Sequence, residues 1–158
     1  MSTEFINVLT AFAVSVIYLI LTIKVISPFF LSITKPMNNA TGVLFFFVVL
    51  GFGIQLFSIS DVATSSLHFH NGREEFSKGI GNWFLFSGIA FAISFLFFRI
   101  SYFIVGLSTP QNEKTELAKN NFTIAGLHAV VFIIISLVAS KPLSNLINTL
   151  VEYPETFN

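Results

Sequence analysis

The chain of 158 residues contains no cysteine. Disulfide bonds, thiolate metal sites and thiol redox chemistry are therefore excluded, while the compartment stays open. Charge is also scarce, because only 10% of the residues are Asp, Glu, Lys or Arg, against about 25% in soluble proteins. The eight basic and eight acidic residues balance, so the sequence predicts no basic surface for nucleic acid.

Hydrophobic residues are abundant, at 54% of the chain with 21 Phe, and a soluble domain of this size could not bury so much apolar surface. They gather in four runs, at residues 6–31, 42–60, 79–107 and 122–140. Each run matches or exceeds the roughly 17–25 residues that a helix needs to cross a bilayer. The sequence therefore predicts an all-α polytopic membrane protein, with four transmembrane helices in one domain of residues 1–158 and lipid as its surroundings.

Basic residues near the helix ends predict the orientation. The side of the membrane that holds the connections 32–41 and 108–121 carries more of them than the other side. The residues on that side are Lys24, Lys35, Arg99, Lys114 and Lys119, and those on the other are Arg73, Lys78 and Lys141. Because cytoplasmic loops are enriched in Lys and Arg, we expect these two connections in the cytoplasm and both termini outside. Trp83 and Tyr102, near opposite ends of the third run, are expected to anchor at the two membrane surfaces.

The two halves of the chain align with each other. Residues 6–60 and 79–140 read as two tandem helical hairpins, with a cation late in the first helix of each, at Lys24 and Arg99. An asparagine pair opens the second helix of each hairpin, at Asn38-Asn39 and at Asn120-Asn121. Any two apolar helices align in some register, so an alignment by chance is the alternative. The interpretation as a repeat depends on the cation and the asparagine pair, which recur in the same order in both halves. We expect a pseudo-two-fold axis along the membrane normal.

These features resemble the YjfL-like bacterial inner-membrane proteins, the domain of unknown function 350. The matching positions are Lys24, Arg99, Asn39-Ala40, Gly42, Gly51 and the segment from Asn121 to Gly126. The resemblance implies a duplicated two-helix fold and a place in the bacterial inner membrane, and it implies no established chemistry.

Hydroxyl and amide residues within the runs have two interpretations. Ser87, Ser94 and Ser101 recur every seven residues on the third helix. Such a stripe forms a close helix contact, in which each hydroxyl bonds to its own helix, or it lines a wetted path through a pore. Gln55 in the second run is expected to donate a hydrogen bond to a neighbouring helix.

Ionisable groups at membrane depth are costly unless they are paired, hydrated or able to reach the interface. We expect Lys24 and Arg99 to extend towards the lipid headgroups, and the alternative is an inward-facing cation pair that attracts anions. His128, two turns into the fourth run, is expected to be neutral and bonded to a hydroxyl or carbonyl of a neighbouring helix. A proton relay, a gate or a haem ligand are its alternatives.

The connections carry weaker signals. His68 and His70, with Glu74 and Glu75 nearby, read as a solvated loop more readily than as a metal site. The 108–121 connection is expected to form a short solvated helix. Pro142 should interrupt the fourth helix at Lys141, and residues 143–153 are expected to form a separate helix along the membrane surface.

Three classes of function remain. The first is a homo-oligomeric ion channel or pore, the second an accessory or structural subunit of a larger membrane complex, and the third and weakest an intramembrane haem or metal carrier. An enzyme is not predicted, because no acid, base and nucleophile set occurs, and neither a cofactor nor a metal site is predicted. The candidate residues for a pore or binding site are Lys24, Gln55, Ser87, Ser94, Arg99, Ser101 and His128.

Overall fold

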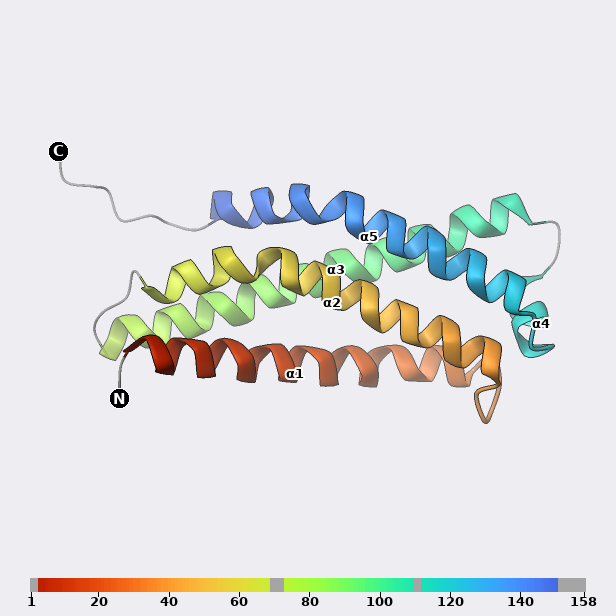
Figure 1. Cartoon of the computed structure of the whole chain (residues 1–158), viewed down its shortest axis with the longest axis horizontal. Helices are drawn as coiled ribbons and strands as arrows, with labels where there is room; N and C mark the ends of the chain where they lie inside the picture. Colours follow the sequence, from red (N-terminus) through yellow and green to blue (C-terminus); the bar gives the residue numbers. More distant parts are fainter. Residues whose placement is uncertain (1–2, 69–72, 110–111, 151–158) are drawn as a thin grey trace.

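The computed structural model describes residues 3–68, 73–109 and 112–150. Within these residues the chain forms five helices and no strand, which confirms the all-α fold. The helices are α1 (Thr3–Leu31), α2 (Asn39–His68), α3 (Arg73–Ser108), α4 (Glu113–Ala118) and α5 (Phe122–Leu150). The four long helices lie along one another and the short α4 closes one end of the bundle, opposite the end where α1 begins and α5 ends (Figure 1).

The long helices have the length and composition of membrane spans. Four of the described helices carry such a segment, at Val8–Leu31, Asn39–Ser60, Ile80–Ser108 and Phe122–Leu150. The predicted four-span, multi-pass architecture is therefore confirmed, whereas the hairpin repeat and the orientation stay predictions.

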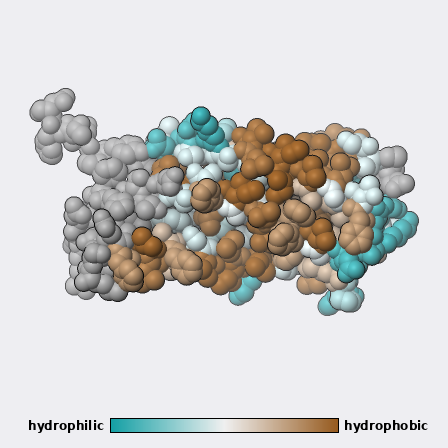
Figure 2. Space-filling model, in the orientation of Figure 1, coloured by the Kyte–Doolittle hydropathy of each residue, from teal (hydrophilic) through white to brown (hydrophobic). Residues whose placement is uncertain are grey.

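The surface of the bundle is strongly apolar. Phe57 is 80% exposed, Leu107 73% and Val138 72%. Figure 2 shows hydrophobic side chains over the middle of one face, and hydrophilic ones at the α4 end and over the later part of α5. Because an exposed apolar surface of this extent is unstable in water, it indicates contact with lipid.

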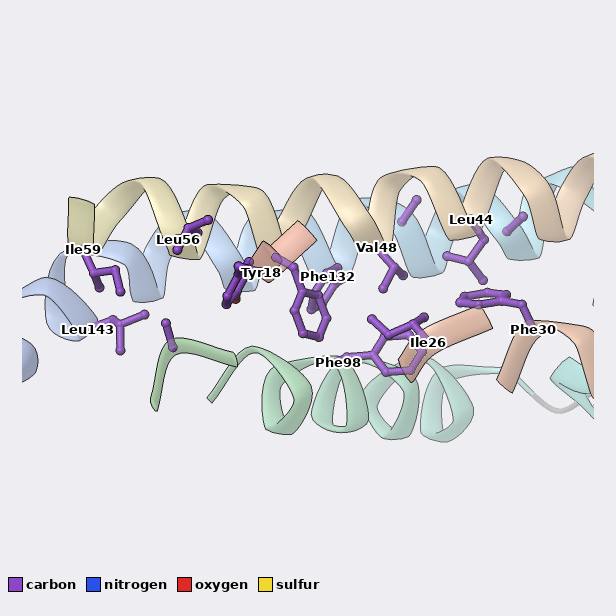
Figure 3. Packing of buried hydrophobic residues seen from close by; sticks show 14 of the residues in the cluster. Tyr18, Ile26, Phe30, Leu44, Val48, Leu56, Ile59, Phe98, Phe132 and Leu143 are labelled. Atoms are coloured by element: carbon purple, nitrogen blue, oxygen red, sulfur yellow. The ribbon is translucent and has the colours of Figure 1, made fainter. Parts of the chain in front are cut away.

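Aromatic rings fill the centre of the bundle. Phe30 of α1, Phe52 of α2, Phe98 of α3 and Phe132 of α5 are all buried. The ring centroids of Phe98 and Phe132 lie 5.8 Å apart with their planes at 86°, and those of Phe52 and Phe132 lie 6.0 Å apart. Several of these residues point into the space between the helices in Figure 3. Edge-to-face packing of this kind stabilises the core beyond area burial alone.

Helices α2 and α5 approach each other closely at Gly51. A side chain at Gly51 would meet the ring of Phe132 and the hydroxyl of Ser136, so only hydrogen fits there. One turn further on, Gln55 donates from Nε2 to the backbone carbonyl of Ser136. The predicted interhelical hydrogen bond of Gln55 is therefore confirmed, and it lies where a small residue lets two backbones come together.

Two predictions for α5 and the 61–78 connection are corrected. Pro142 lies inside α5, which continues to Leu150, so residues 143–150 of the predicted surface helix are its last turns. Residues 151–153 of that prediction lie outside the described residues. Leu143 and Ile147 are buried in the core, and their packing outweighs the hydrogen bond that Pro142 removes. The connection predicted at 61–78 is shorter in the structure, because α2 extends to His68 and α3 starts at Arg73. His70 and the side chains of His68, Glu74 and Glu75 lie outside the described residues.

Trp83 and Tyr102 do not have the expected positions at the lipid surface. Trp83 is completely buried in the core, and Tyr102 is half-buried with its ring against other aromatic rings. Both side chains are largely apolar, so the core of the bundle is as favourable an environment for most of their surface as the membrane–water interface.

Helix α4 is held at the bundle end by asparagine side chains. Asn38 donates from Nδ2 to the carbonyls of Leu117, at 2.7 Å, and Ala118, at 3.2 Å, while its Oδ1 accepts from the backbone N–H of Thr41 at 2.9 Å. In return Asn120 accepts from the N–H of Ala40 at 2.9 Å. One side chain thus caps the start of α2 and the end of α4 together.

Candidate functional site

A buried acid and a buried histidine meet beneath α4. Nε2 of His128, on α5, lies 3.1 Å from Oε2 of Glu113, on α4, and both side chains are at least nine-tenths buried. No hydrogen bond joins Nε2 to the carboxyl, because the two groups are not aligned for Nε2 to donate or to accept. The two groups are therefore in contact without a formed hydrogen bond.

Three further residues shape this pair. The Tyr102 ring stacks on the His128 ring, with centroids 4.6 Å apart and planes at 23°. The Thr109 hydroxyl lies 3.3 Å from Oε1 of Glu113 and 3.0 Å from the carbonyl of Val105, and its single hydrogen serves one of these acceptors at a time. A Cβ at Gly106 would lie 3.2 Å from Oε1, so the absence of a side chain there makes room for the carboxyl.

Burial away from water raises the pKa of Glu113, and the hydrogen bond from Thr109 opposes this shift in part. A raised pKa favours the protonated, neutral form of the Glu113 carboxyl over the carboxylate. A protonated Glu113 beside an unprotonated His128 leaves no net charge in the site. Adding or removing a proton would create an uncompensated buried charge.

The site borders the protein surface through a shallow hollow. The hollow has a volume of about 300 Å³, and it is lined by Tyr102, Gly106, Asn112, Glu113 and Lys114. The ammonium of Lys114 lies 6.0 Å from the centroid of the Phe29 ring. Glu113 is therefore buried but next to a route by which protons can reach it.

The local sequence explains how α4 presents Glu113. Asn112 caps the helix, and its side chain accepts a hydrogen bond from the N–H of Thr115 at 3.3 Å. Glu113 and Leu117 are four residues apart, so they share one face of α4, and both are buried. The predicted short helix in this connection is confirmed, but one of its faces is packed against the bundle and not solvated.

Most of the candidate residues that the sequence indicated lie apart from one another in the structure. Lys24 and Arg99 are exposed, as expected for side chains that extend towards headgroups. Ser94 donates to the carbonyl of Ala90 at 2.7 Å and Ser101 to that of Phe98 at 2.8 Å, so both bond to their own helix. Gln55 joins α2 to α5, and Ser87 lines a cavity between α1 and α3. Among the candidates, His128 alone belongs to the site under α4.

Sequence reasoning missed the partners of His128. The expected partner was a hydroxyl or carbonyl, whereas the structure provides the carboxyl of Glu113 and the ring of Tyr102. The i, i+4 spacing of Glu113 and Leu117 was the available signal, because a leucine in a short polar helix marks the face that docks.

Comparisons with protein-family models, with curated proteins and with solved structures find no match to the chain. The resemblance to the YjfL-like family therefore stays a prediction.

Proposed function

We propose that this small integral membrane protein responds to protons at the membrane face where α4 lies, with Glu113 and His128 as the proton-binding pair. In this role the chain serves as a pH-sensing subunit of a larger membrane assembly. The observation that carries the proposal is the 3.1 Å contact between two buried ionisable side chains from different helices. Buried ionisable groups at the edge of a membrane span are costly, and such groups commonly mark functional sites.

Helix α4 is the element that the pair would control. It has only six residues, too few to be stable alone, so its position depends on its contacts with the bundle. These contacts are the Glu113–His128 pair, the buried Leu117 and the asparagine bonds from Asn38 and Asn120. Loss of the first contact would weaken the docking of α4 without unfolding the long helices.

The direction of the pH effect follows from the pKa of Glu113, which is raised above its ordinary value of 4.5 when α4 is docked. The docked state therefore holds the proton more tightly than an undocked state. The contribution of Glu113 to docking is therefore fully present below about pH 4.5, and it is lost as the pH rises through the raised pKa. The charged or titratable groups that face Glu113 in the described chain are His128 of α5, Tyr102 of α3 and Lys114 of α4 itself.

A channel built from several copies is the alternative. It rests on the serine stripe and on the paired cations Lys24 and Arg99. Ser94 and Ser101 of the stripe are buried and bond to their own helix, Gln55 bonds to α5 within the same bundle, and both cations are exposed. The hydrogen bonds of Ser94, Ser101 and Gln55 therefore favour a role in helix packing within one copy over a role in lining a pore between copies. Ion flux from liposomes that contain only this protein would favour the channel over the sensing subunit.

The proposal is tested by the position of α4 as a function of pH. Because the chain has no cysteine, Asn39→Cys and Thr115→Cys place two spin labels specifically, on exposed positions of α2 and α4. Electron paramagnetic resonance in nanodiscs should show the labels separating as the pH rises from 4 to 9. In Glu113→Gln the amide replaces the protonated carboxyl, so the labels should stay at the docked separation throughout.

Glu116→Gln is the matched control. Glu116 is the second acid of α4, but it bonds to Lys119 and Asn121 and has no interaction with His128 in the described part of the chain. This variant should keep the pH profile of the parent. An unchanged label separation across the whole pH range in the parent protein would refute the proposal, as would the same profile in Glu113→Gln.

A further inference from the structure

The cavity between α1 and α3 opens along the outside of the bundle as an apolar groove. It has a volume of about 210 Å³, and its wall is almost entirely apolar. Ile17, Leu21 and Val25 of α1 and Phe84 of α3 line it, and each of them is between 42% and 52% exposed. Because these apolar side chains face the lipid, a hydrocarbon chain is the group that packs against them most favourably.

Two cations border the end of this groove that lies towards α4. Lys24 follows Ile17 by about two turns of α1, and Arg99 follows Gly88 by about three turns of α3. Each cation therefore lies on the face of its helix that borders the groove, and both are exposed. Helices α1 and α3 run in the same direction, towards the end of the bundle where α4 lies (Figure 1).

Ring contacts between α1 and α3 place these two cations at a similar level. The ring centroids of Tyr18 and Phe91 lie 6.0 Å apart, and those of Phe29 and Phe98 lie 5.4 Å apart. The lysine of α1 falls between these two levels, and the arginine of α3 directly follows the second. The ammonium of Lys114, on α4, lies 6.0 Å from the centroid of the Phe29 ring, which brings a third cation to the same end of the groove.

These three cations have no acidic partner in the described part of the chain. The two acids of α4 are engaged elsewhere, because Glu113 is buried against His128 and Glu116 bonds to Lys119 at 2.9 Å. Like charges at one end of a groove repel one another, and a bound anion removes this repulsion. The groove thus joins a place for a hydrocarbon chain to a place for a negative charge, and a phospholipid presents both.

We propose that the groove binds a phospholipid with a net negative headgroup, with one acyl chain along the apolar wall and the phosphate near Lys24, Arg99 and Lys114. The surroundings of the cations disfavour a water-soluble anion, because Ile23, 43% exposed, and Ile100, 39% exposed, face the lipid beside them. A zwitterionic headgroup would bring a further positive charge to the site, so a net negative headgroup is favoured. The proposal is independent of the proposed proton response.

Native mass spectrometry tests the selectivity of the site. The protein in detergent is mixed with equal amounts of phosphatidylglycerol and phosphatidylcholine that carry the same acyl chains, and we expect the phosphatidylglycerol complex to dominate. Lys24→Gln and Arg99→Gln should each lower the ratio of the two complexes about two- to five-fold, and the double variant should lower it further. Lys141→Gln is the matched control, because it removes one exposed charge from α5, away from the groove, and should leave the ratio unchanged.

Gly88→Leu tests the place of the acyl chain. An added Cβ at Gly88 meets no described atom within 4 Å, so the leucine enters the groove and should weaken the binding of both lipids. Gly53→Leu is its control, because Gly53 has equally open space on α2, outside the groove lining, and this variant should bind lipid as the parent does.

Equal ratios in the parent and in the double variant would overturn the proposal, as would an equal fall of the ratio in Lys141→Gln. Unchanged lipid binding in Gly88→Leu would overturn the placement of the acyl chain. Displacement of bound phosphatidylglycerol by glycerol phosphate would show a site for a soluble anion and would overturn the ligand class.

Discussion

Gly51 provides a direct test of the packing between α2 and α5. A Cβ added to Gly51 would collide with Cε1 of Phe132, and it would lie 2.8 Å from Cδ1 of the same ring and 3.0 Å from the hydroxyl oxygen of Ser136. The ring has little freedom to turn away, because it packs against Phe52 and Phe98. Gly51→Ala therefore forces the two helices apart or distorts the core.

The size of the effect follows from two opposing contributions. Overpacking a well-filled core costs about 1–3 kcal/mol. Replacing glycine with alanine within a helix returns up to about 1 kcal/mol through helix propensity. Gly53→Ala gains the second contribution without the first, since an added Cβ there meets no described atom within 4 Å. We therefore expect Gly51→Ala to be less stable than Gly53→Ala by about 1–3 kcal/mol.

Reversible unfolding by sodium dodecyl sulfate in mixed micelles, followed by the emission of Trp83, measures this difference. The variant Gly51→Ala/Phe132→Leu removes the colliding ring atoms, so its loss of stability should be smaller than the sum of the two single losses. Equal stability of Gly51→Ala and Gly53→Ala, within about 0.5 kcal/mol, would refute the packing described for α2 and α5.

Two further substitutions test individual contacts. Asn38→Ala removes the bonds that join α4 to α2, so it should cost about 1–2 kcal/mol and speed hydrogen exchange of the α4 amides, whereas the exposed Asn39→Ala should do neither. Gln55→Ala leaves a cavity and should cost about 2 kcal/mol or more in the same unfolding assay, while Gln55→Leu, which retains the volume, should cost less than about 1 kcal/mol. Similar losses for the two Gln55 variants would show that the hydrogen bond to Ser136 matters more than the packing.

The spans were predictable from sequence because the thickness of the bilayer sets their length. Helices α1, α2, α3 and α5 each contain the run of apolar residues that the sequence indicated. The interhelical bond of Gln55 was predictable for a related reason, since an amide at membrane depth must find a partner inside the protein.

Which residues form the candidate site depends on tertiary contacts, and local sequence patterns do not predict these contacts. Glu113 lies in a polar connection, where an acidic residue is normally solvated. Leu117, on the same face of α4, packs against the bundle, and Glu113 is therefore buried with it. Trp83 and Tyr102 have side chains that suit the membrane surface as well as the core, and sequence position alone does not decide between them. Pro142 disrupts an isolated helix, but the burial of Leu143 keeps α5 continuous.

Single cysteines in this cysteine-free chain test most directly that the bundle crosses a membrane with the Glu113–His128 site at one face. Thr115→Cys places a thiol on exposed α4, Thr149→Cys places one at the exposed far end of α5, and Val138→Cys places one on the lipid-facing surface between them. With a membrane-impermeant maleimide we expect Thr115→Cys and Thr149→Cys to react from opposite sides of sealed vesicles, and Val138→Cys to remain unreactive until detergent is added. Reaction of Thr115→Cys and Thr149→Cys from the same side, or rapid reaction of Val138→Cys in intact vesicles, would contradict the membrane-spanning bundle.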